Sequence, residues 1–258
     1  MYSVSIIGSG NVAARLGHLF RKKKFELAGI YSRNKNAVNA LAVELKVPVV
    51  QQLKDLPQAD LTILAVSDNA ITHVASHMPV NSKTLVVHTS GITTLDALMP
   101  HERRGVFYPL QSLSKNKETN WDNVPLLIET TNRKDEELLQ SVALQLTLPC
   151  HILNYEQRQY IHLAAVFANN FTNRLYAIAF EIAGMHGLDP TLLTPLIQET
   201  AAKIKCMSPH DAQTGPARRR DSATIEQHVD LLRQHSQYRQ LYEIMSRSII
   251  EALASESA

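Results

Sequence analysis

The chain has little cysteine, little glycine, almost no excess charge and no long apolar run. Its two cysteines, Cys150 and Cys206, are too few for a disulfide framework or a four-thiolate zinc site. With 26 basic and 24 acidic side chains the formal net charge is +2, which gives no overall footprint for nucleic acid or an anionic membrane. No stretch approaches the roughly 18 apolar residues that a membrane-spanning helix needs. The hydrophobic fraction of 45% is nevertheless ample for a core.

The first residues carry no basic leader and run directly into an expected strand at 2–7, which argues against a signal peptide. We therefore expect a cytoplasmic protein without nucleic-acid or membrane partners. His73 and His77 share a helix face but lack the Glu-flanked pattern of a zinc helix, so no metal is expected.

Apolar runs alternate with helical patterns as far as about residue 153. Strands are expected at 2–7, 26–31, 47–50, 61–66, 84–88, 106–108, 126–129 and 150–153, with helices at 11–23, 37–45, 70–77 and 133–146. Such alternation predicts a parallel sheet with right-handed crossovers. Beyond this point only helices are expected, at 155–186, 190–205, 221–235 and 238–253. The sequence thus predicts an α/β plus all-α protein, with a Rossmann-like domain at 1–153 and a helical domain at 154–258.

Two of the nine glycines, Gly8 and Gly10, stand at the first strand-to-helix turn. Gly8 permits a tight turn, Gly10 lets a pyrophosphate approach the backbone, and Ala13 allows close packing of helix on strand. The helix that follows offers unpaired N–H groups and the positive end of its dipole. This G-x-G-x-x-A pattern, in its strand–helix context, predicts a dinucleotide site that includes Ser9, Asn11 and Val12.

The residues after the second strand indicate which dinucleotide binds there. An NAD site usually places Asp or Glu at this point, whereas this chain has Ser32-Arg33-Asn34. Arg33 offers a guanidinium fork to a 2′-phosphate, and Ser32 and Asn34 can add hydrogen bonds. The pattern favours NADP over NAD, although a solvated surface arginine is the alternative for Arg33.

The N-terminal half resembles the NADP-binding domain of pyrroline-carboxylate reductases and deazaflavin-dependent NADP reductases. The shared segments are Gly8–Ala13, Tyr31–Asn34 and Ala65–Asp68. The whole chain resembles a bacterial family that joins a Rossmann-like domain to a C-terminal helical domain of unknown function, family 2520. That likeness is carried by His88–Gly91, Tyr108–Ser112, His162–Phe171 and Thr214–Pro216.

The resemblance implies positions for further site residues. Ala65 and Val66 would lie beside the cofactor, and Ser67 and Asp68 near the diphosphate or the nicotinamide ribose, although Asp68 is equally explained as a helix N-cap. His88 and Ser90 would face the nicotinamide at the end of a strand. For His88, a place in the core is the alternative.

The helix expected at 155–186 carries polar groups on an otherwise apolar face. That face holds His162, Ala165, Val166, Asn169 and Asn173, with Asn170 beside it. Buried amides and imidazoles need partners, which either a ligand pocket or neighbouring helices and water would supply. Hydroxyacid dehydrogenases of this architecture use Lys-x-x-x-Asn on the corresponding helix, and no such lysine is present. The proton must then come from His162, His88 or Tyr108, or the substrate must arrive protonated.

These expectations combine into an NADP-dependent oxidoreductase of a small metabolite, an imine, a keto acid or a hydroxy acid, working at the cleft between the two domains. The catalytic and substrate-binding candidates are His88, Ser90, His162, Asn169 and Asn170. The alternatives are a non-catalytic NADP-binding sensor and a structural dimerisation module. The apolar content of the long helix and the resemblance together predict a homodimer formed through the helical domain.

Overall fold

The computed structural model describes residues 2–254. By their internal contacts they form two compact units, Met1–Asn169 and Asn170–Ala258. None of the helices in the described range combines the length and the apolar character that a membrane crossing requires.

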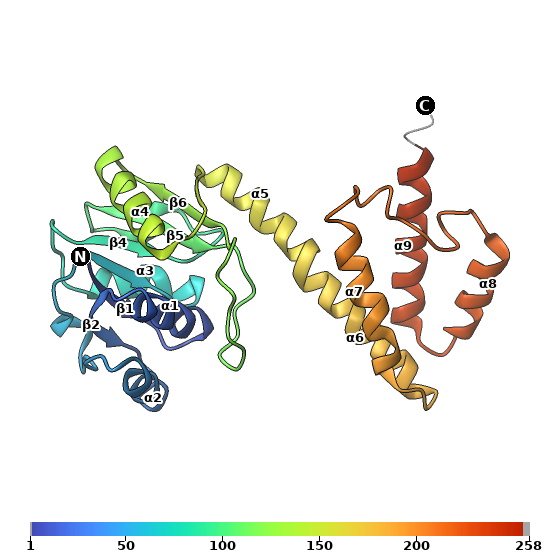
Figure 1. The fold of residues 1–258 in the computed structure, drawn as a ribbon, viewed down its shortest axis with the longest axis horizontal. Coiled ribbons are helices and arrows are strands. Elements are labelled where there is room, and N and C mark those ends of the chain that lie inside the picture. Colours follow the sequence, from blue (N-terminus) through green and yellow to red (C-terminus); the bar gives the residue numbers. More distant parts are fainter. Residues whose placement is uncertain (1, 255–258) are drawn as a thin grey trace. The chain divides into compact units, whose positions relative to one another are not determined.

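The first unit is built on a seven-stranded sheet with the order β2-β1-β3-β4-β5-β6-β7. Figure 1 shows this sheet with the helices beside it, in blue to green. Its strands are β1 (Ser3–Ile7), β2 (Glu26–Tyr31), β3 (Leu61–Leu64), β4 (Leu85–His88), β5 (Arg104–Pro109), β6 (Leu126–Thr130) and β7 (Cys150–Ile152). The first five strands are mutually parallel, as the alternation of strands and helices predicts. Strands β3 and β4 are buried along their whole length, because helices cover both faces of the sheet.

Two strand predictions are wrong in detail. Strand β6 pairs with β5 antiparallel, since residues 110–125 contain no α-helix to carry a parallel crossover. The segment 47–50 forms no strand; Val49 makes only an isolated bridge to Ile30. The sheet is therefore mixed: β1 to β5 are parallel, and β6 and β7, which are parallel to each other, run in the opposite direction.

The helices of the sheet unit are α1 (Asn11–Lys22), α2 (Lys35–Leu45), α3 (Asp68–His77), α4 (Arg133–Leu146) and α5 (Tyr155–Ala165), with short 3-10 turns η1 (Leu53–Asp55) and η2 (Leu95–Leu98). Apolar side chains of α1, α2 and α4 form a core with one face of the sheet. Helix α3 and η2 form a second, smaller core with the other face. The result is the three-layered arrangement typical of doubly wound α/β domains.

The second unit contains helices and turns in the part that the structure describes. They are α6 (Thr172–Met185), η4 (Pro190–Leu193), α7 (Thr194–Lys203), α8 (Ser222–Leu231) and α9 (Ser236–Ala254). The single helix expected at 155–186 is instead interrupted by a π-helical segment, η3 (Val166–Phe171), between α5 and α6. A π segment changes the helical register, so the face expected at 162–173 does not continue through it.

Helix α5 belongs to the sheet unit, which therefore extends beyond the expected domain boundary at residue 153. Within this helix, Arg158 is fully buried and pairs with Glu129 of β6. The boundary between the two compact units lies after Asn169.

Candidate functional site

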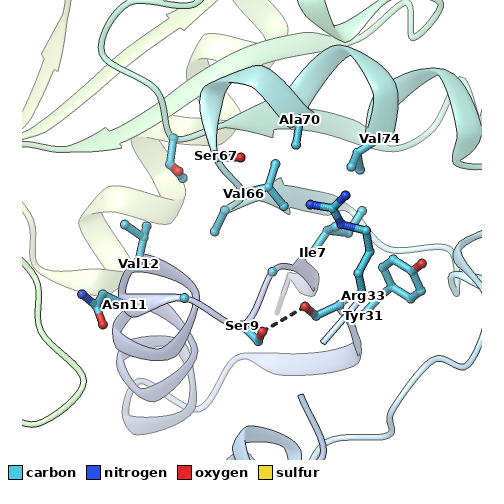
Figure 2. Close-up of a pocket in the computed structure, with 15 residues that line it drawn as sticks. Ile7, Ser9, Asn11, Val12, Tyr31, Arg33, Val66, Ser67, Ala70 and Val74 are labelled. Carbon is cyan, nitrogen blue, oxygen red and sulfur yellow. Dashed lines mark hydrogen bonds between the residues drawn. The ribbon is translucent and has the colours of Figure 1, made fainter. Parts of the chain in front are cut away.

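A cavity of about 340 Å³ lies beside the ends of β1, β2 and β3. Strand β1 lies between β2 and β3. The chain adds β2 on one side of β1 and then β3 and β4 on the other, so the strand order reverses at β1. Open α/β sheets bind ligands at this switch point, outside the carboxyl ends of their strands. The cavity is lined by Ile7, Gly8, Ser9, Gly10, Asn11, Val12, Tyr31, Ser32, Arg33, Ala65, Val66, Ser67, Ala70, Val74 and Thr89 (Figure 2).

The two glycines of the first turn have different roles. Gly8 has φ +134°, and a Cβ there would overlap the carbonyl group of Ala65, so only glycine fits between β1 and β3. A Cβ on Gly10 would meet nothing within 4 Å. Gly10 therefore leaves open space above the helix terminus, which is what the approach of a diphosphate to the backbone requires.

The first turn of α1 presents free backbone donors to this space. Gly10 is the N-cap and supplies no side-chain hydrogen bond, and the first intrahelical bond runs from the N–H of Ala14 to Gly10 O at 3.0 Å. The N–H groups of Asn11, Val12 and Ala13 are therefore left without helical partners. No acidic side chain occupies this turn. Free amides at the positive end of a helix dipole form a ready site for an anion.

The side of the cavity after β2 carries hydroxyls and one cation. Ser9 Oγ and Ser32 Oγ lie 2.9 Å apart, and the guanidinium of Arg33 points toward Ala70 and Val74 of α3 (Figure 2). Arg33 makes no hydrogen bond or ion pair within the described residues, and no Asp or Glu lines the cavity. Asn34 does not line it, because its side chain accepts the N–H of Ala37 and caps α2.

The end of β3 forms the opposite wall of the cavity. Ala65, Val66 and Ser67 line it as the resemblance implies, and Asp68 does not. Asp68 is also not the N-cap of α3: Ser67 holds that position and Asp68 begins the helix. Thr89, which follows β4, lines the cavity too, whereas its neighbours His88 and Ser90 do not.

His88 and Ser90 are placed beneath the surface, not on it. His88 is fully buried, and its Nδ1 accepts the N–H of Ser90 at 3.1 Å. Burial lowers the pKa of His88 to about 4, with a further contribution from the Arg158 charge, so the imidazole is neutral at physiological pH. The hydroxyl oxygen of Ser90 accepts hydrogen bonds from Ile92 and Thr93. Because His88 is fully buried, it lies in the core, which was the alternative to a place facing the nicotinamide. In this conformation it has no surface that a substrate could contact.

His162 on α5 lies against two elements of the sheet unit. Its Nδ1 is 3.0 Å from the hydroxyl of Tyr108 at the end of β5. Its ring also abuts Gly91, where a Cβ would lie 2.6 Å from Cγ of His162. Burial and the charge of Asp68 raise the pKa of Tyr108, so the phenol keeps its proton. Tyr108 can thus donate to Nδ1, which leaves Nε2 of His162, without a partner in the described residues, as the proton-carrying atom.

Asn169 and Asn170 lie in η3, and both side chains are exposed. Neither side chain is among those that line the cavity described above, and their contact with substrate remains a prediction. Within residues 2–254, no three His, Cys, Asp or Glu side chains converge as a metal site needs.

The sequence analysis missed Arg158. This residue stands four positions before His162, on the same face of α5, and is fully buried beneath the loop that follows β4. Its signal was present in the sequence: a face of Ala, Val and His residues also carries a cation, which must find partners if it is buried.

The fold and the cavity define a Rossmann-like dinucleotide-binding protein. The family model of the Rossmann-like domain matches residues 1–111, and the model described as a domain of unknown function, DUF2520, matches residues 124–249. A solved structure from Bacteroides fragilis, whose name assigns it to the NADP oxidoreductases, is 33% identical, with a TM-score of 0.89 over 97% of this chain and 98% of that one. The chain belongs to this family, in which a Rossmann-like domain is joined to a DUF2520 domain.

More distant structures share the fold. A pyrroline-5-carboxylate reductase from Coxiella burnetii is 16% identical, with a TM-score of 0.58 over 98% of this chain and 97% of that one. A reductive aminase from Aspergillus terreus, solved with NADPH and ethyl-5-oxohexanoate, is 14% identical, with a TM-score of 0.69 over 96% of this chain and 94% of that one. No curated protein matches the sequence.

Proposed function

We propose that the protein is an NADP-dependent oxidoreductase that reduces the C=N bond of a small imine. The observation that carries the proposal is the acid-free cavity, in which free helix amides lie opposite the unpaired guanidinium of Arg33. The relatives named for NADP and for imine chemistry support it.

The residues of the cavity fit the diphosphate and the 2′-phosphate of NADP. The free amides of Asn11, Val12 and Ala13 would hold the diphosphate, and Gly10 leaves it room. Arg33, with Ser32, would bind the 2′-phosphate that distinguishes NADP from NAD. Bound NADPH supplies a hydride to the electrophilic carbon of the substrate.

The proton for the substrate nitrogen would come from Nε2 of His162 in its imidazolium form, which becomes the neutral imidazole when it donates. The hydroxyl of Tyr108 is hydrogen-bonded to Nδ1 and fixes the ring, so that Nε2 remains free to donate. His162 is half-buried, which leaves it within reach of a ligand. Hydride addition to carbon and proton transfer to nitrogen together convert the C=N bond into an amine.

The charges around Tyr108 favour an imine over a keto acid. The exposed carboxylate of Asp68 acts on Tyr108 and would stabilise the iminium cation that protonation creates. A keto acid needs a cation for its carboxylate. Arg158 and His88 do not supply one, because Arg158 is buried and paired with Glu129, and His88 is neutral.

The test combines binding with turnover. NADPH affinity, measured by titration calorimetry, should fall at least tenfold in Arg33→Ala, with NAD affinity unchanged, because only NADP carries the 2′-phosphate. NADPH consumption should be seen with cyclic imines such as 1-pyrroline and not with pyruvate. Equal loss of both dinucleotides would contradict the role of Arg33. Tight NADPH binding without turnover of any imine or keto acid would contradict the enzymatic proposal and favour a non-catalytic NADP-binding sensor.

We also propose that the second unit forms a homodimer. Among its described residues, only Ala217 and Ser246 are buried, so its helices have almost no core of their own. Its exposed apolar side chains include Leu175, Phe180, Met185, Leu188, Leu192, Leu196, Ile204, Met207, Leu231, Ile244 and Met245. Exposed apolar surface of this extent is typical of a subunit interface. Light scattering at micromolar concentration should give twice the chain mass of 28.8 kDa, and the single-chain mass would overturn the proposal.

A further inference from the structure

Arg158 is the largest fully buried side chain of the described molecule. Removing a guanidinium from water is costly unless every donor finds an acceptor. Here the Nε and Nη2 atoms lie 3.2 Å and 2.9 Å from Oε2 of Glu129. Nη1 donates to Ser90 O at 3.0 Å, and Nη2 also donates to Thr93 O at 2.8 Å. The side chain therefore joins helix α5, strand β6 and the loop after β4.

The loop that Arg158 binds is held together by hydrogen bonds of its own. Ser90 Oγ accepts the N–H groups of Ile92 and Thr93 at 3.2 Å and 3.1 Å. The N–H of Ser90 is bonded to the buried ring of His88. These bonds hold the loop in one conformation, and Arg158 anchors it through the two carbonyl oxygens.

The same loop supports His162. Gly91 lies between the two carbonyl groups that Arg158 binds, and its Cα faces the His162 ring so closely that a Cβ would overlap it. His162 is one helical turn beyond Arg158 on α5. Both the helix that carries the imidazole and the loop against which it rests are therefore held by one guanidinium.

Glu129 extends this arrangement to Tyr108. In the antiparallel pair of β5 and β6, Glu129 lies opposite Val106, and Tyr108 is two residues further along β5. Side chains two residues apart on a strand project from the same face. The carboxylate that anchors Arg158 and the phenol that bonds His162 thus stand on one face of the sheet.

We propose that Arg158 and Glu129 are a positioning pair, which holds His162 against Gly91 and on the hydroxyl of Tyr108. The inference rests on the proposed role of His162 as proton donor. Arg158 itself touches no exposed surface and acts only through the loop and the helix. A lysine would keep the charge opposite Glu129, but its single ammonium lacks the planar fork that reaches the carboxylate and two carbonyl groups together.

The experiment compares Arg158→Met and Arg158→Lys with Arg103→Met in the full-length protein. Arg103 is a matched control, because it also pairs with a buried carboxylate, Asp135, and with the carbonyl of Lys83, far along the sheet from His162. Two quantities are measured: the tautomer of His162, by NMR of protein labelled with ¹⁵N-histidine, and kcat and KM for NADPH oxidation with an imine. The His162 signal is assigned by its loss in His162→Gln.

In the unaltered protein we expect a single tautomer with the proton on Nε2. Arg158→Met should mix the two tautomers and lower kcat at least tenfold while the KM for NADPH stays constant, since misplacement of an acid affects the chemical step. Arg158→Lys should recover part of both effects. Arg103→Met should lower the melting temperature and leave the tautomer and kcat unchanged. If Arg158→Met resembles Arg103→Met, the pair is merely structural and the proposal fails.

A second variant covers the case in which Arg158→Met does not fold. Gly91→Ala leaves the buried ion pair intact and displaces the imidazole directly, so it should reproduce the mixed tautomers. An unchanged tautomer in Gly91→Ala would overturn the proposal. The NMR measurement needs no turnover, so it separates this inference from the proposed function: an inactive protein with the expected tautomers would contradict only the latter.

Discussion

The two units differ most in where their apolar side chains lie. The sheet unit buries side chains on both faces of its strands, in one large core and one small core. In the helical unit, Leu192 is 72% exposed and Leu196 is 64% exposed, on consecutive turns of chain. A domain is stable when the burial of apolar surface outweighs the loss of conformational entropy. The sheet unit meets this condition within one chain, whereas the helical unit needs another surface.

Because of this difference, we expect the two units to determine different properties of the protein. The dinucleotide cavity and the His162–Tyr108 pair lie wholly within the sheet unit. Cofactor affinity should therefore depend on the core of a single chain. Assembly should depend on the exposed apolar residues of the helical unit. The one tryptophan, Trp121, packs against the large core of the sheet unit, so its fluorescence reports on that unit alone.

The largest effect is expected from a cavity in the large core. Phe20 is fully buried, with its ring centroid 5.0 Å from that of Phe25 and 6.0 Å from that of Phe107. Phe20→Ala should lower the unfolding free energy by about 3–5 kcal/mol, measured by urea titration of Trp121 fluorescence. Leu192→Ala is the control and should leave this transition unchanged. Equal shifts in the two variants would show that the units do not unfold separately.

A smaller effect should follow from acid. The pKa of His88 is lowered by its burial, with a contribution from the Arg158 charge, from 6.5 to about 4. Between these values the unfolded chain binds a proton that the folded unit does not, so stability falls as the pH drops from about 6.5 toward 4. At about 1.4 kcal/mol for each pKa unit, the loss reaches ~3 kcal/mol.

The same urea titration of Trp121, repeated from pH 7 to pH 4, measures this loss. His88→Asn keeps an acceptor for the N–H of Ser90 and should flatten the pH dependence, apart from a remaining slope from the buried His101, whose pKa is also lowered. His151→Gln, at an exposed position, should not change it. An unaltered slope in His88→Asn would show that the acid sensitivity arises elsewhere.

The sequence predicted those parts of the fold that local patterns determine. Periodicity located helix α4 at Arg133–Leu146, and the structure adds the cap, Asn132, whose side chain accepts the N–H of Asp135. The direction of β6 could not be obtained in this way, because pairing is set by contacts distant in sequence. The π segment at Val166–Phe171 was missed for a related reason: a strict 3.6-residue period describes its residues equally well.

The candidate site likewise contains residues that local patterns predict and residues whose roles depend on contacts distant in sequence. Gly8 was predictable because its backbone conformation and the nearby Ala65 carbonyl allow only glycine, and Gly10 because a side chain there would fill the space that a diphosphate needs. The neutral state of His88 and the role of Arg158 were not, since both depend on burial among residues from α5, β6 and the loop after β4. A sequence shows which groups are chemically able to act, whereas burial decides which of them reach a ligand.

The smallest effect is expected in the helical unit and concerns assembly. Leu196→Asp places a charge on the exposed apolar face and should weaken a dimer at least tenfold, or about 1.4 kcal/mol, as measured by sedimentation of the protein over a dilution series. Val43→Asp, at a 77% exposed position of α2 in the sheet unit, is the matched control and should leave the mass unchanged. NADPH affinity should be the same in both variants. If Leu196→Asp instead weakens NADPH binding and leaves the mass constant, the apolar face serves the cavity and the functional separation of the two units is wrong.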